Sequence, residues 1–91
     1  MRWRVPSRPG SIRWRRWDED VAVRVESTGG THLLGPAAGC AFTVLLGAPS
    51  GMDLRQLADT MLDGAEPGDL ERLDAMLLEL HRLGVIEQVP A

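Results

Sequence analysis

The stretch "IRWRRWDEDVAVRVESTGGTHLL", residues 12–34, decides the fold, because apolar and polar residues alternate in it with period two. Ile12 and Trp14 share one face of a predicted half-buried strand over 12–17. A second strand over 21–26 turns its three valines inward, and "THLL", Thr31 to Leu34, forms a third. The turns "DED" (18–20) and "STGG" (27–30) join them. The stretch predicts a three-stranded antiparallel meander with the strand 31–34 at an edge.

After residue 34 the period becomes helical. Pro36 at a start and Gly47 at an end predict a helix of small residues that packs closely on the sheet. A second helix follows over 54–62, capped by Asp53, and the longest runs from Asp69 to Leu83 before Gly84. "VIEQV" (85–89) predicts a short strand or extended tail. The expected fold is α+β and winged-helix-like, in the order βββααα.

The first ten residues, "MRWRVPSRPG", carry two prolines and a glycine and predict an arm rather than a periodic element. Trp3 and Val5 are apolar enough to hold this arm against the body. We therefore expect an arm over 1–10 and one domain over 11–91, since 91 residues suffice for a single modest core.

Charge is distributed unevenly along the chain. Residues 1–17 hold six arginines and no acid, whereas the rest holds four arginines and thirteen acids. The arginine-rich start is either a face for an anionic partner, which includes a modifying enzyme, or solvated surface. The longest uncharged run, 29–52, is broken by glycines and prolines, so we expect no membrane contact. A single cysteine, which forms no internal disulfide, indicates a reducing, cytoplasmic setting.

Residues of catalytic type are few and scattered. Cys40 lies among small helical residues and is expected to be a core thiol. His32 is expected at the sheet surface, and His81 near a helix C-terminus, where its cation suits the helix dipole. Neither histidine has metal-ligand spacing to the single cysteine. We predict no enzyme, no catalytic residue, no metal and no cofactor.

The ordered set of short motifs resembles the PqqD-like peptide chaperones, the recognition elements of ribosomally made, modified peptides. The matching features are Trp3, the pair Trp17-Asp18, "THLL" followed by Pro36, and the terminal "LHRLGVIE" (80–87). They resemble most the HPr-rel-A branch of that family. The resemblance extends over nearly the whole chain.

The resemblance implies a binder of a precursor or leader peptide, which adds as a strand to residues 31–34 and lies against the last helix. It also implies a partner enzyme, either a modifying enzyme or a protein related to HPr kinase. Carried onto this sequence, the implied contact residues are Thr31, His32, Leu33 and Leu34 on the strand and Leu73, Met76, Leu77 and Leu80 on the helix. The leucine stripe of that helix can also be core, or can divide its face between core and peptide.

Three alternatives stay open. A winged-helix domain can bind DNA, but the last helix carries Asp69, Glu71, Asp74 and Glu79 against Arg72 and Arg82, a net charge that phosphates repel. Nucleic acid is therefore the weaker prediction. A structural subunit whose edge strand is covered by a partner protein is the second alternative. A homodimer formed through the same edge is the third.

Overall fold

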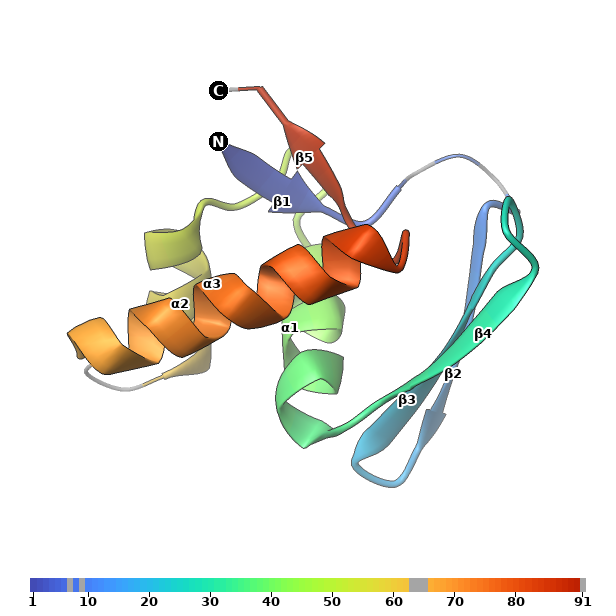
Figure 1. The fold of residues 1–91 in the computed structure, drawn as a ribbon, viewed down its shortest axis with the longest axis horizontal. Coiled ribbons are helices and arrows are strands. Elements are labelled where there is room, and N and C mark those ends of the chain that lie inside the picture. Colours follow the sequence, from blue (N-terminus) through green and yellow to red (C-terminus); the bar gives the residue numbers. More distant parts are fainter. Residues whose placement is uncertain (7, 9, 63–65, 91) are drawn as a thin grey trace.

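The computed structural model describes residues 1–6, 8, 10–62 and 66–90. Strands β2 (Ile12–Trp17), β3 (Asp20–Val25) and β4 (Gly30–Leu34) form an antiparallel sheet in chain order. The helices α1 (Pro36–Leu46), α2 (Leu54–Met61) and α3 (Pro67–Arg82) follow it, as Figure 1 shows. The predicted α+β order, a three-stranded meander and then three helices, is confirmed.

The sheet is buried on one face only. Val21, Val23 and Val25 point from β3 into the core, as their alternation predicts. In β2, by contrast, every residue after Ile12 is exposed, so the prediction of a half-buried strand is wrong. The cause is that α1 contacts β3 and β4, whereas β2 extends past this cover. The ring centre of Trp14 lies 6.1 Å from that of Phe42, and the two ring planes make an angle of 70°.

Helix α1 lies close to the sheet because it carries a glycine at the crossing point. A Cβ atom on Gly39 would lie 3.1 Å from Cγ2 of Val21, so a larger residue would push α1 away. Pro36 occupies the first turn, as predicted. Cys40 is exposed, and the prediction of a core thiol is wrong. Gly39, Ala41 and Phe42 form the buried side of the helix, and Cys40 faces away from it.

Local capping sets the starts of α2 and α3. The Asp53 carboxylate accepts a hydrogen bond from the Gln56 backbone N–H at 2.8 Å, and the Gln56 side chain returns one to the Asp53 N–H. Helix α3 starts at Pro67, two residues before the predicted start, because Glu66 is its N-cap and Asp69 is the third helical residue of a capping box. Gly84, with φ of 82°, follows the end of α3.

The chain termini form a second, two-stranded sheet. Strand β1 (Arg2–Arg4) pairs antiparallel with β5 (Glu87–Val89), and the two ends of the chain lie together in Figure 1. Trp3 also exchanges backbone hydrogen bonds of 2.8 and 2.9 Å with Met52. The prediction of an arm without a regular element is therefore wrong for residues 2–4, although Trp3 and Val5 are buried as expected.

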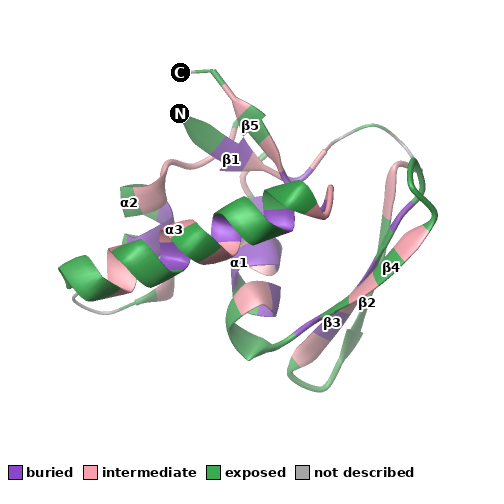
Figure 2. Cartoon of the chain, in the orientation of Figure 1, coloured by how far each residue is buried: buried purple, intermediate pink, exposed green. Residues whose placement is uncertain are grey.

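One hydrophobic core joins all these elements. It contains the valines of β3, Phe42 and Leu45 of α1, Leu57 of α2, and Val85 and Ile86 after α3. Figure 2 shows the buried residues on the inward side of α1 and α3 and along β3. Among the described residues, no polar or charged residue is fully buried. The interior is therefore apolar, and polar chemistry is confined to the surface.

Candidate functional site

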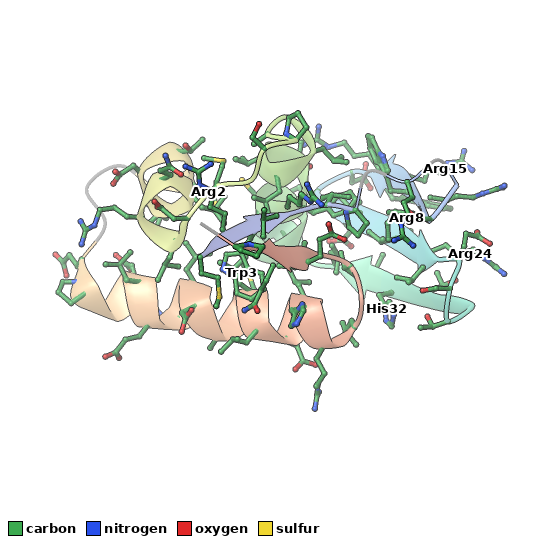
Figure 3. All side chains as sticks on the ribbon, turned by 90° about the horizontal axis from the view of Figure 1, so that it is seen from above. Arg2, Trp3, Arg8, Arg15, Arg24 and His32 are labelled. Atoms are coloured by element: carbon green, nitrogen blue, oxygen red, sulfur yellow. The ribbon has the colours of Figure 1, made fainter. Side chains whose placement is uncertain are left out.

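The free edge of β4 is the first part of the candidate site. Strand β4 pairs with β3 along one side, and no strand of the described residues pairs with its other side. The prediction of an edge strand over 31–34 is thus confirmed. Such an edge presents backbone N–H and C=O groups that another extended segment can bind. Figure 3 labels His32 on this strand.

The register divides the side chains of β4 between two faces. Leu34 and His32 lie opposite Val21 and Val23 and share the inner face of the sheet. Leu34 is buried in the core, whereas His32 is half-buried. Thr31 and Leu33 lie on the outer face, where Leu33 is 69% exposed. Three of the four predicted strand residues therefore have surface available to a partner, and Leu34 has almost none.

Helix α3 has little apolar surface to offer from its leucine stripe. Leu77 is fully buried, and Leu73 and Leu80 are nearly so. These three side chains belong to the core cluster that includes Phe42 and Leu57. Of the four predicted helix residues, only Met76 is half-buried. The stripe is mainly core, and Met76 at its border has the most accessible surface of the four predicted helix residues.

An apolar pocket brings the predicted residues Met76 and Leu73 together with five residues that were not predicted to contact the peptide. The pocket has a volume of about 240 Å³ and lies between the start of α1, the end of α2 and the first half of α3. Its lining residues are Ala37, Met61, Leu62, Asp69, Arg72, Leu73 and Met76. Ala37 is only three residues beyond the end of β4. The pocket therefore opens close to where the free edge ends.

One ion pair forms the polar part of this pocket. The Asp69 carboxylate accepts hydrogen bonds from the Glu66 backbone N–H at 3.1 Å and from the Arg72 guanidinium at 2.8 Å. The bond from Glu66 has the larger effect and that from Arg72 the next, and together they hold the pKa of Asp69 below its ordinary value of 3.8. Arg72 is thus already paired within its own helix, and the remaining lining is mainly apolar.

The residues of catalytic or metal-binding type lie apart in the described ranges. His32 and Cys40 are on different elements, β4 and α1, and neither adjoins a cluster of acids and histidines. No group of three or more His, Cys, Asp or Glu residues in the described ranges could hold a metal ion. His81 lies near the end of α3, as predicted, with its ring 5.5 Å from that of Trp3. Across those ranges no helix is long and apolar enough to span a bilayer.

Comparisons with known proteins give one informative likeness. No protein-family model matches the chain, and no curated protein matches it. Among solved structures, it is similar to that described as TbiB1 in complex with the TbiA(beta) leader peptide. The TM-score is 0.76 at 14% sequence identity, and the match covers 97% of this chain and 99% of that chain. At this identity the likeness shows a shared fold over essentially the whole length of both chains.

Proposed function

We propose that this protein binds a leader or precursor peptide, without catalysing a reaction itself, and presents it to a modifying enzyme. The observation that carries the proposal is the free edge of β4 ending beside an apolar pocket that contains Met76. The TbiB1 structure, which has this fold, was solved with a leader peptide bound, and this supports the assignment. Association with an HPr kinase-related system, and with it a cytoplasmic setting, stays a prediction based on the sequence resemblance.

The two parts of the site would supply different terms of the binding energy. A peptide added to β4 gains main-chain hydrogen bonds, each worth only about 0.5–1.5 kcal/mol net and indifferent to sequence. Micromolar affinity needs about 8 kcal/mol after the cost of ordering the peptide. Burial of one large apolar side chain contributes about 1.5–3 kcal/mol. The pocket is therefore needed for affinity as well as for selectivity.

The position of the pocket determines the path of the peptide along the site. An added strand that runs past the Leu34 end of β4 reaches Ala37 and then the pocket beside Met76. Peptide side chains on the inner face would contact His32, and those on the outer face would contact Leu33. We therefore propose that the bound peptide has an extended segment and, at the end that lies at the pocket, a large apolar residue.

The DNA-binding alternative gains no support from α3. Its two arginines are paired within the helix, Arg72 with Asp69 at 2.8 Å and Arg82 with Glu79 at 2.7 Å. A helix that reads bases needs donors free to meet phosphates and base edges. The exposed acids of α3 would instead repel the phosphates.

Two residues of α3, Met76 and Leu78, provide a matched test. A random peptide display library would be selected on the immobilised protein, and the affinity of a selected peptide measured by fluorescence anisotropy. Met76→Ala should weaken it about tenfold, whereas Leu78→Ala, which changes a 49% exposed residue outside the pocket, should leave it within about twofold. Addition of the selected peptide should change the NMR chemical shifts of the backbone amides of β4. Equal affinities in both variants, or shifts confined to another surface, would refute the proposal.

A further inference from the structure

The outer face of the three-stranded sheet is a second exposed surface, separate from the pocket. The register places Arg13, Arg15 and Trp17 of β2 on this face with Ala22 and Arg24 of β3 and Thr31 and Leu33 of β4. Trp17 is 62% exposed, and Leu33 is similarly uncovered. This face lies opposite the one on which the valines of β3 enter the core, and Figure 3 shows Arg15 and Arg24 directed away from the helices.

This face carries a small net positive charge. Arg13 and Arg24 lie directly opposite each other, a pairing of like charges that destabilises a sheet. Glu26 compensates by contacting both, at 3.5 Å from Nε of Arg13 and 3.1 Å from Nε of Arg24. Asp20, at the hairpin end, is the other carboxylate on this face. Three guanidinium groups therefore meet two carboxylates here, whereas the whole chain has a net charge of −3.

The arginines surround a shallow depression. Ala22 lies between Arg15 on one neighbouring strand and Leu33 on the other, and its small side chain leaves a hollow of about 250 Å³. Arg13, Arg15 and Arg24 line this hollow. The accessible lining of the hollow is mainly apolar. Arg13 and Arg24 already contact Glu26, so the guanidinium of Arg15, which makes no ion pair within the described residues, is the group best placed to bind a carboxylate through two parallel hydrogen bonds. Trp17 and Leu33 can contact apolar groups beside it.

We propose that the outer face of the β2-β3-β4 sheet docks a short acidic segment of a protein partner, in which a Glu or Asp enters the hollow over Ala22 and apolar residues contact Trp17 and Leu33. A protein segment fits better than a nucleic acid. The remainder of the chain is acidic and would repel an extended phosphate backbone, which reaches beyond this face, more than a short segment that stays on it.

This surface overlaps the proposed peptide site only at Leu33 and Thr31. The pocket is built from the three helices, and none of its lining residues belongs to the sheet. Only Leu33 and Thr31 border both regions, since they lie on the edge strand but face outward. A peptide on β4 and an acidic segment over Ala22 could thus be bound together, which suits a protein that brings a peptide to a partner.

The test uses the whole chain and a defined probe, a short fluorescein-labelled peptide of Glu and Gly with one Leu. The double variant Arg15→Glu/Arg24→Glu should weaken its binding at least about tenfold. The control Arg55→Glu/Arg82→Glu, with the same charge change on α2 and α3, should change it less than about twofold. Circular dichroism would verify that both variants are folded, and the affinity of the display-selected peptide should be unaltered in both.

Each result supports or overturns the assignment. The assignment is supported if the affinity for the acidic probe falls as salt rises and is lost only in Arg15→Glu/Arg24→Glu. Equal losses in both variants would mean attraction to net charge rather than to this face, and would overturn it. Tighter binding of an oligothymidylate than of the acidic peptide, lost in the same variant, would make the face a nucleic-acid surface. Failure of the probe to bind the wild type at low salt would also refute the proposal.

Discussion

Leu77 allows a sharp test of which residues of α3 serve the core and which serve the peptide. Its side chain is fully buried, whereas that of its neighbour Met76 is half-buried and lines the pocket. Leu77→Ala should therefore destabilise the fold without touching the proposed peptide site. Met76→Ala should do the reverse. Two consecutive residues of one helix then give opposite results in two assays.

The magnitude follows from the burial of Leu77. Truncation of a fully buried leucine to alanine costs about 2–5 kcal/mol, and the upper half applies where neighbours cannot close the cavity. Leu77 belongs to a core cluster with Phe42 and Leu57, two side chains without exposed surface. At about 0.05–0.15 kcal/mol per residue, 91 residues give a total stability of about 5–14 kcal/mol. We therefore expect a loss of about 3–4 kcal/mol that leaves a folded but weakened protein.

Urea unfolding followed by circular dichroism measures this loss. The midpoint should fall while the slope of free energy against urea stays constant, because the same surface is exposed on unfolding. The selected peptide should bind the folded fraction of Leu77→Ala with wild-type affinity. A variant that keeps its midpoint but loses the peptide would show that Leu77 lies in the groove after all, and would refute the separation of core from site.

Two further predictions concern parts of the fold that the site depends on. Trp3→Ala removes a buried side chain that joins the terminal sheet to the core, and it should lower the free energy of unfolding in urea by about 3–5 kcal/mol. Deletion of residues 1–10 should lower it further. A deletion variant as stable as the wild type would contradict the packing described. Asp53→Ala removes the cap of α2 and should lower the free energy of unfolding by about 0.5–2 kcal/mol, measured as a lower thermal midpoint. The control Asp59→Ala, on the same helix but away from the cap, should lower it less.

Regular patterns in the sequence predicted the elements that have a period of their own. Alternation along 12–34 gave the meander and its inward valines, and capping residues such as Asp53 gave the helix starts to within two residues. Strand β1 was not predictable in this way, because it has three residues and forms only where β5 and Met52 meet it in space. The exposure of β2 was missed for a similar reason, since alternation does not tell how far the helices extend over a sheet.

The candidate site was predictable in part. Edge position followed from strand order, so β4 was identified correctly as a free edge. The pocket was not, because its residues come from the start of α1, the end of α2 and the side of α3, and helix spacing does not encode how three helices meet. Cys40 shows the same limit within one helix, where small residues occur on both the buried and the exposed side.

The small size of the domain explains why the proposed surfaces lie where they do. A chain of this length needs nearly every strongly apolar position for its single core, and the leucine stripe of α3 is used in this way. Binding surface must then come from features that cost the core little: an unpaired strand edge, a methionine at the border of the stripe, and apolar residues such as Trp17 and Leu33 on the uncovered face of the sheet. Exposed apolar groups of this kind reduce solubility unless a partner covers them. The two proposed surfaces, one along β4 and the pocket and one over Ala22, use such positions, and a variant that loses one ligand while it keeps the other would distinguish two partners from one.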